Sequence, residues 1–336
     1  MDPSGEMGSI MVSEKILALK KDTNEITSNP ILDSISIDVI KYFEYNIANP
    51  LFQDKLKKIE SYLNIPITIS IDDHWKSLFN EYIEAYAFWY ISRKVYIERV
   101  PEASQNRPDY KMKFEDNDYY LEVKSPFYLN TDSNYRQDQE KGLEMQIDIE
   151  EQVDSGVSVA MGSQVHQPYN NGRSNYKPNS KRVIIEGIVN KVMQNFKAGQ
   201  YTLGDTLLLV DLRQLGLSAK PNFSAMPVYN ESAMGKQCIC SGELWNAAFA
   251  QVGNPIYYFP MDYPYGNIEG KIRVEGILIQ YPEIRAVIFQ TESMNAEKCT
   301  LVGFARTDDC KMMKLLKVIC EYYNDDSNSR RMYLEN

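Results

Sequence analysis

The chain has 336 residues, of which 43% are hydrophobic, so it can bury a substantial core and is not expected to be intrinsically disordered. Its formal net charge of −10 disfavours a protein that binds nucleic acid over its whole surface, because affinity for phosphates comes from cations. Its two histidines, His74 and His166, are too few for metal sites built from several histidines and lie in poor contexts for Ser-His-Asp catalysis.

The cysteines and the N-terminal sequence indicate the compartment. The chain has five cysteines, an odd number, and its start from Met1 to Glu6 lacks the basic and apolar regions of a signal peptide. The longest apolar runs, such as Ala85 to Ile91, are far shorter than the roughly 18 residues that a membrane span requires. We therefore expect a cytoplasmic protein with no membrane segment.

Residues 1–72 are expected to form a helical N-terminal preface. Residues 1–30 are polar and are expected to be loosely ordered at the start. Two short helical patterns follow, around 35–45 and 51–63.

Apolar residues recur at spacings of three and four between residues 73 and 94, which predicts a helix with a wide apolar face. On a helical projection Glu81 lies inside the apolar band, whereas Glu84 points away from its centre. A carboxylate that faces inward needs a charged partner or a metal, so Glu81 is a candidate site residue. The equal alternative is an edge residue hydrogen-bonded to a neighbouring loop.

A β-branched strand is expected over residues 95–100, and a hairpin follows it. Segments 109–114 and 119–124 both alternate polar and apolar residues, which predicts two half-buried strands that face each other. Because Asp and Asn favour turns, we expect the turn to centre on Asp116 and Asn117.

This register gathers charged groups on one face of the hairpin. It places Asp109 opposite Lys124 and Lys111 opposite Glu122, with Asp109 and Glu122 roughly 7 to 8 Å apart on the diagonal. Two carboxylates at that spacing can share a divalent cation, and the backbone carbonyl of Val123 could supply another oxygen ligand. The alternative is two cross-strand ion pairs on a solvated face, each contributing roughly 0.2 to 1 kcal/mol.

An acid-rich helix is expected over residues 133–152, after which the charge changes sign. From Ser155 to Ile185 the sequence has no Asp or Glu, and its glycines and prolines predict a loop. Interleaved tyrosines and cations suit contacts with phosphates and bases, the alternative being a solvated surface loop. The candidate nucleic-acid-binding residues are Arg173, Lys177, Lys181 and Arg182.

An amphipathic helix from Val183 to Phe196 leads into an almost continuously apolar run over 206–212. Such a run predicts a strand buried on both faces, and a helix between strands predicts an α/β layer. Residues 214–336 are expected to be an α/β C-terminal extension that binds substrate or a partner. Its predicted strands and closing helix are 285–290, 299–305 and 311–323.

The pair Pro108-Asp109, followed by Glu122-Val123-Lys124, resembles the motif of the PD-(D/E)xK nuclease superfamily. In that superfamily an aspartate starts one strand, an acid-x-lysine tripeptide lies on the next, and a helical glutamate often precedes both. The resemblance implies a restriction-endonuclease-like core over residues 73–213, with a mixed sheet flanked by helices.

The resemblance also implies a Mg²⁺- or Mn²⁺-dependent deoxyribonuclease, an endonuclease rather than an exonuclease, in prokaryotic restriction, repair or antiviral defence. Asp109 and Glu122 would hold the metal, Lys124 would orient the attacking water, and Glu81 would complete the site. Because the chain is acidic, a second copy or an obligate protein partner could supply further contacts to DNA. Two alternatives stay open: a catalytically inactive module that binds nucleic acid or protein, and a hydrolase of nucleotides.

Overall fold

The protein forms two compact units, Met1–Tyr86 and Ala87–Asn336. The computed structural model describes residues 11–22, 32, 35–65, 73–101, 107–126, 131–162, 181–194, 196–213, 227–231, 237–258, 267–292, 299–326 and 333–334. The sequence predicted divisions after residues 72 and 213. In the structure the boundary between the two compact units lies within a helix, and strands beyond residue 213 share a sheet with the predicted hairpin.

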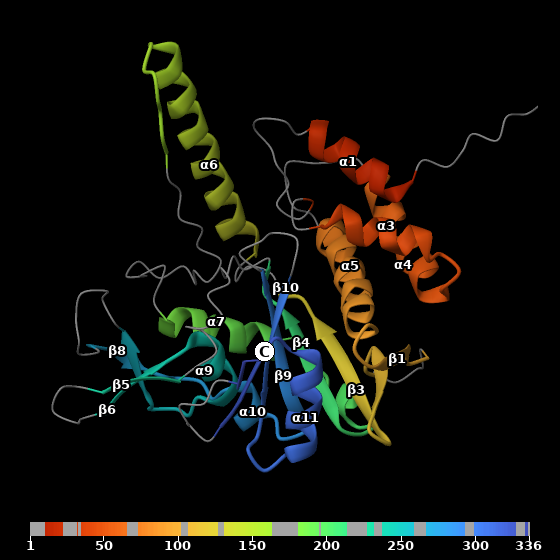
Figure 1. Ribbon diagram of the computed structural model, residues 1–336. Helices are drawn as coiled ribbons and strands as arrows, with labels where there is room; N and C mark the ends of the chain where they lie inside the picture. The colour runs from red at the N-terminus through yellow and green to blue at the C-terminus, as the bar shows by residue number, and fades with distance from the viewer. Residues whose placement is uncertain are drawn as a thin grey trace, which may run out of the picture. The chain divides into compact units, whose positions relative to one another are not determined.

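The N-terminal unit is helical, as predicted for the preface (Figure 1). A loosely ordered start was the wrong expectation for residues 12–22, which form a helix because Val12 and Ile16 are buried. Asn49 caps the helix that begins at Pro50, because its side chain accepts a hydrogen bond from Leu51 N at 3.0 Å. The helices are α1 (Val12–Asp22), α3 (Ile37–Tyr45), α4 (Pro50–Leu63) and the greater part of α5 (Asp73–Ile91).

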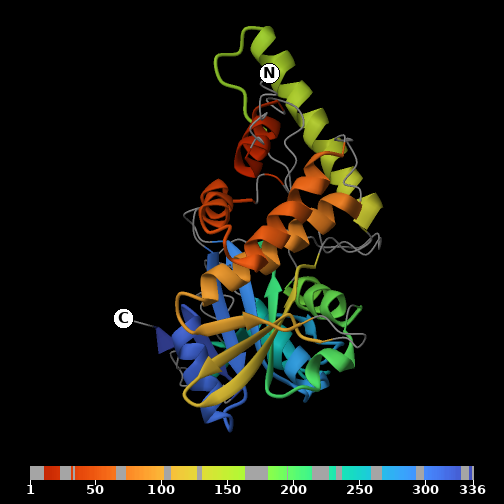
Figure 2. The ribbon, with the colours of Figure 1, turned by 90° about the vertical axis from the view of Figure 1, so that its right-hand side faces the viewer.

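Among the described residues of the second unit, the largest sheet has eight strands in the order β1-β2-β3-β4-β9-β10-β11-β12. Neighbours β3, β4 and β9 run parallel, whereas β1, β2 and β3 pair in antiparallel fashion, so the sheet is mixed as predicted. Figure 2 shows β1 to β3 in orange to yellow. The strands are β1 (Tyr96–Arg99), β2 (Tyr110–Phe114), β3 (Asn117–Lys124), β4 (Thr206–Asp211), β9 (Ile284–Glu292), β10 (Cys299–Ala305), β11 (Tyr322–Asp325) and β12 (Tyr333–Leu334).

Helices cover both faces of this sheet. On one face, α7 (Lys181–Gln194), α9 (Glu243–Phe249) and α10 (Ile277–Gln280) share a core with inward residues of β4, β9 and β10. On the other, α11 (Cys310–Ile319) lies so close to β10 that a side chain at Gly303 would come within 2.8 Å of Leu316. Phe88 of α5 contacts Tyr110 on that second face. The predicted architecture, a mixed sheet flanked by helices, is confirmed.

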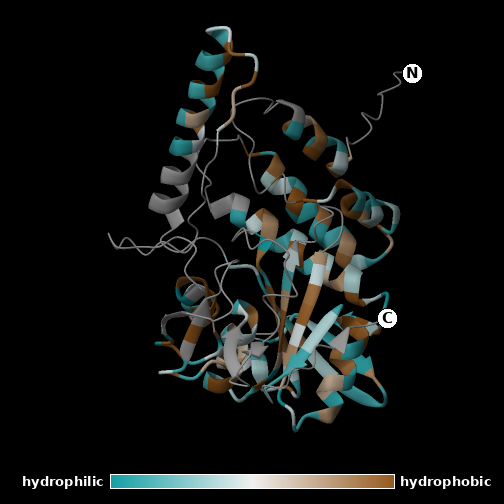
Figure 3. Cartoon of the chain, turned by 60° about the vertical axis from the view of Figure 1, so that its left-hand side comes forward, coloured by the Kyte–Doolittle hydropathy of each residue, from teal (hydrophilic) through white to brown (hydrophobic). Residues whose placement is uncertain are grey.

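The strand β4 is the centre of the unit. All six of its residues are buried, which confirms the strand predicted from the apolar run. Figure 3 shows that strands of the sheet are coloured as hydrophobic. The chain passes from β3 to its parallel neighbour β4 through a long crossover. This crossover contains α6 (Thr131–Asp154), α7 and the short 3-10 helix η1 (Ala198–Tyr201).

Two small hairpins stand apart from the main sheet: β5 (Pro227–Glu231) with β6 (Gln237–Ser241), and β7 (Pro255–Tyr258) with β8 (Asn267–Lys271). The longest helix, α6, has 24 residues and is rich in acids. In the parts of the chain that the structure describes, no helix is both long and apolar enough to cross a membrane.

Candidate functional site

The predicted hairpin exists, and a two-residue turn sets its register. Glu115 and Asp116 have φ angles of 44° and 34°, the left-handed values that a type I′ turn requires at both of its central positions. Phe114 therefore pairs with Asn117, and the pairing continues along the strands to Tyr110 and Leu121.

The predicted register was wrong by two residues, because the turn centres on Glu115 and Asp116 and not on Asp116 and Asn117. As a result Lys111 faces Tyr120 instead of Glu122, and its ammonium pairs with Asp118 at 2.7 Å. A shift of two residues leaves every side chain on its original face of the sheet, since side chains alternate with a period of two. The charged groups predicted to share a face therefore still share it.

Asp109 lies just before β2 and is held from two sides. Its backbone carbonyl accepts a hydrogen bond from Val100 N at 3.0 Å, and its carboxylate Oδ2 accepts one from Val123 N at 2.8 Å. The amide of Val123 belongs to the residue between Glu122 and Lys124. The structure thus brings Asp109 to the acid-x-lysine tripeptide, level with Glu122 and not with Lys124 as the predicted register had it.

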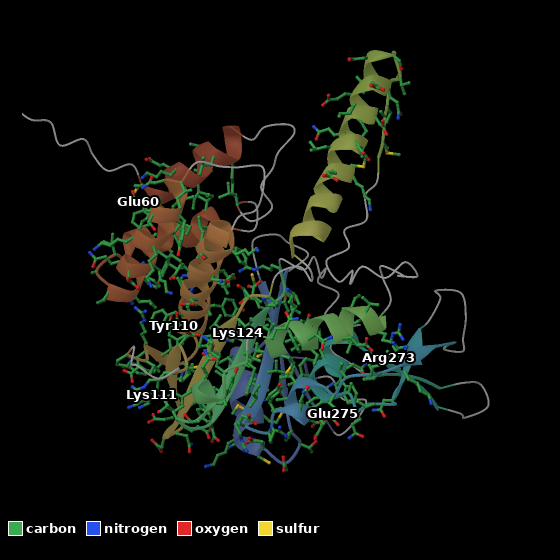
Figure 4. All side chains as sticks on the ribbon, turned by 180° about the vertical axis from the view of Figure 1, so that it is seen from behind. Glu60, Tyr110, Lys111, Lys124, Arg273 and Glu275 are labelled. Atoms are coloured by element: carbon green, nitrogen blue, oxygen red, sulfur yellow. The ribbon has the colours of Figure 1, made fainter. Side chains whose placement is uncertain are left out.

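Glu122 and Lys124 lie near the end of β3 and form a close ion pair. Lys124 Nζ is 2.6 Å from Glu122 Oε1, and the two side chains are 18% and 2% exposed. Figure 4 marks Lys124 together with Tyr110 and Lys111 of the neighbouring strand. Because β3 side chains alternate, Glu122 and Lys124 share the face that α7 covers, opposite the face of Leu121 and Val123.

Gln200 is a site residue that the sequence reasoning missed. Its Nε2 donates to Glu122 Oε1 at 2.5 Å, and its Oε1 accepts from Lys124 Nζ at 3.2 Å. It lies on η1, which residues 202–205 connect to β4, and reaches the site because β4 runs parallel to β3. No local pattern around Gln200 indicated this, since its partner Glu122 is 78 positions away in the sequence.

Tyr201, the next residue, adds a neutral hydroxyl near the carboxylates. Burial, and then the charges of Glu122 and Asp109, raise the pKa of this phenol, so it stays protonated across the physiological range. Its ring stacks on Phe196 with centroids 5.0 Å apart, and Phe196 in turn contacts Tyr281 at 4.0 Å. These rings anchor η1 in the core of the unit.

The carboxylates of Asp109 and Glu122 are therefore the acidic groups at this point, and the amide of Gln200 adds a neutral oxygen beside Lys124. The backbone carbonyl of Val123 as a further ligand stays a prediction. Nowhere among the described residues do three or more His, Cys, Asp or Glu side chains gather into a set that could hold a metal. A pair of carboxylates fits Mg²⁺ or Mn²⁺, which keep several waters and take substrate phosphate oxygens as ligands. It does not fit a closed structural zinc site.

Glu81 belongs to the N-terminal unit, and its described partners lie there. Lys55 Nζ is 2.5 Å from Glu81 and also pairs with Glu84, while Lys58 is 3.7 Å from Glu81. Burial lowers the pKa of the Lys55 ammonium, but Glu84 and Glu81 outweigh that effect and raise this pKa above its ordinary value. The inward carboxylate thus has a charged partner, and a role for Glu81 in the site stays a prediction.

The basic segment is only partly described. Arg173 and Lys177 lie outside the described residues, and Lys181 begins α7 without a described side chain. Arg182 follows in the first turn of α7, with its side chain directed past Gly270 of β8. Nucleic-acid binding by these four cations stays a prediction.

A second buried polar group occurs near the same end of the parallel strands, on the opposite sheet face. Asp211 at the end of β4 pairs with the Arg213 guanidinium at 2.9 Å and accepts a hydrogen bond from Gln290 Nε2 at 2.6 Å. Because Asp211 lies on the opposite sheet face from Glu122, it is not a further carboxylate for the site at Glu122.

Comparison of the chain with protein-family models, curated proteins and solved structures finds no match.

Proposed function

We propose that this protein is a metal-dependent nuclease with a restriction-endonuclease-like core that hydrolyses phosphodiester bonds, most favourably in DNA. One observation carries the proposal: the hydrogen bond from Val123 N to Asp109 Oδ2, which brings Asp109 to the Glu122-Val123-Lys124 tripeptide. Two carboxylates and an ammonium then meet at one end of a mixed sheet. That combination serves phosphoryl transfer better than acyl transfer, which would need a nucleophile paired with a histidine base, a pair that the described residues of the site do not include.

In this proposal Asp109, Glu122 and the carbonyl of Val123 would hold Mg²⁺ or Mn²⁺. The bound ion would supply Lewis acidity toward the phosphate and make water more acidic. Lys124 would place its ammonium beside the developing charge of the phosphate or orient the attacking water. The Glu122 carboxylate keeps this ammonium at the site, because the two groups are only 2.6 Å apart.

The second candidate function is an inactive relative that binds nucleic acid or a protein partner. The observation that favours it is that the Glu122 carboxylate is already compensated by Lys124 and Gln200 through short hydrogen bonds. Metal binding separates the two functions. In an enzyme Mn²⁺ should raise the thermal unfolding midpoint of the wild type but not of Glu122→Gln, because a ligand that binds only the native state stabilises it.

The direct test is cleavage of circular duplex, linear duplex and single-stranded DNA and of RNA, each with Mg²⁺, Mn²⁺ or EDTA. Lys124→Ala should lower the cleavage rate by roughly 10²-fold or more, the usual contribution of a positioned proton donor or acceptor. Lys113→Ala is the matched control, because Lys113 is an exposed lysine on the same hairpin. Loss of cleavage in Glu81→Gln as well would indicate that Glu81 takes part in the site.

Metal-dependent cutting by the wild type and by Lys113→Ala, but not by Lys124→Ala, supports the nuclease. Absence of cutting on all four substrates, together with no thermal shift by Mn²⁺, would leave the inactive module as the function.

A further inference from the structure

We propose that Gln200 is a positioning residue of this site, which holds Glu122 and Lys124 in the orientation that receives the metal and the substrate phosphate. The inference rests on the proposed function and goes beyond it, since neither the motif nor the hairpin includes this side chain.

The amide of Gln200 closes a ring of three hydrogen bonds. Lys124 Nζ donates to Glu122 Oε1 at 2.6 Å and to Gln200 Oε1 at 3.2 Å, while Gln200 Nε2 donates to the same Glu122 oxygen at 2.5 Å. Each member is therefore fixed by the other two. Without the amide, Glu122 and Lys124 would each lose one hydrogen bond and could turn more widely about their own side-chain bonds.

The chemistry of the ring calls for a carboxamide. The position must donate to a carboxylate and at the same time accept from an ammonium, and a neutral amide does both in a fixed plane. A carboxylate at position 200 could accept from Lys124 but would face Glu122 with a like charge. An apolar side chain of the same size could do neither.

Burial makes these hydrogen bonds effective. Gln200 is 9% exposed and Glu122 is 2% exposed, so water competes poorly for their polar groups. In such surroundings the orientation of a carboxylate depends on its protein partners. Residues that orient metal ligands in this way typically change metal affinity or activity by 10- to 100-fold when they are replaced.

The backbone that carries Gln200 is itself held in place. Gln200 N donates to Lys197 O at 2.9 Å within η1, and the adjacent Tyr201 is buried with its ring stacked on Phe196. The next segment of chain is the fully buried strand β4, whose register with β3 pairs Glu122 with Leu208. The amide therefore approaches Glu122 from a rigid support.

The test replaces Gln200 by methionine, which has a similar length and no hydrogen-bonding amide. Binding of Mn²⁺ alone, followed by calorimetry or electron paramagnetic resonance, should weaken by roughly tenfold or more. With DNA as substrate kcat should fall while KM stays constant, because a buried positioning residue does not touch the substrate. The matched control is Gln194→Met, since Gln194 is an exposed glutamine on α7.

The thermal unfolding midpoint of each variant shows whether the fold is kept, and Gln200→Leu provides a second variant if the methionine destabilises the protein. Wild-type Mn²⁺ affinity in Gln200→Met would overturn the inference while leaving the nuclease intact. A wild type that neither binds Mn²⁺ nor cleaves any substrate would overturn both. If both variants lose the fold, Gln200 is a structural residue and the positioning role is rejected.

Discussion

Asp109 combines a structural and a proposed chemical role in one carboxylate. Its Oδ2 atom accepts the hydrogen bond that joins the start of β2 to the middle of the tripeptide on β3, and its negative charge would contribute to metal binding. The two roles can be separated, because an asparagine keeps an oxygen acceptor of the same reach while it removes the charge.

We expect Asp109→Asn to retain a free energy of unfolding within about 1 kcal/mol of the wild type, and Asp109→Ala to lose about 1.5 to 3 kcal/mol, the range for a hydrogen bond to a charged group. Both variants should lose Mn²⁺ binding and cleavage. Urea unfolding gives the stabilities and calorimetry gives the metal affinity. Equal stability of Asp109→Ala and the wild type would mean that the bond to Val123 contributes nothing to the fold.

At the scale of elements, the hairpin turn is the clearest target for stabilisation. Glu115 and Asp116 both adopt left-handed backbone angles, which cost non-glycine residues of order 1 kcal/mol or more each. Replacing them by Asn and Gly, the preferred pair for a type I′ turn, should raise the free energy of unfolding by about 1 kcal/mol. The replacement also removes the exposed ion pair of Glu115 with Lys314, which contributes little.

Urea unfolding measures this gain. Asp308→Gly serves as control, because Asp308 occupies a turn without a left-handed φ angle and a glycine there only adds flexibility to the unfolded chain. A drop in stability for the Asn-Gly double variant would contradict the turn geometry.

Elements could be predicted from the sequence where a local period was strong. The helix around residues 73–94, the two strands of the hairpin and the buried strand over 206–212 all appear, since side-chain alternation and apolar runs are local properties. The hairpin register could not be predicted, because Glu115 carries no glycine-like signal for a left-handed angle. Gln200 could not be predicted either, since only the parallel pairing of β3 with β4 brings it to Glu122.

For the whole molecule, an acidic chain that acts on DNA must concentrate its cations locally, because the net charge of −10 repels the phosphates at long range. If the basic segment contacts DNA, removing its cations should weaken binding and lower the slope of log K against log salt by about 0.9 for each phosphate that is no longer neutralised. The test uses Asp109→Asn, with alanine in addition at Arg173, Lys177, Lys181 and Arg182.

A control with the same change in net charge distinguishes local binding from overall repulsion. It places alanine at four lysines that are exposed elsewhere, namely Lys57, Lys311, Lys314 and Lys317. Fluorescence anisotropy at several salt concentrations gives both slopes. An identical slope of log K against log salt for the two sets of four alanines would show that the cations of the basic segment do not contact the phosphates of DNA.

The separation of 78 positions between Glu122 and Gln200 also has a consequence for the order of folding. The hairpin joins neighbouring residues and can form within microseconds, but the pairing of β3 with β4 must first close a long loop that includes α6 and α7. A nascent chain on the ribosome therefore carries Asp109, Glu122 and Lys124 well before β4 emerges. The hydrogen bonds of Gln200 with Glu122 and Lys124 can form only when most of the polypeptide has been synthesised. The length of the crossover therefore delays completion of the site.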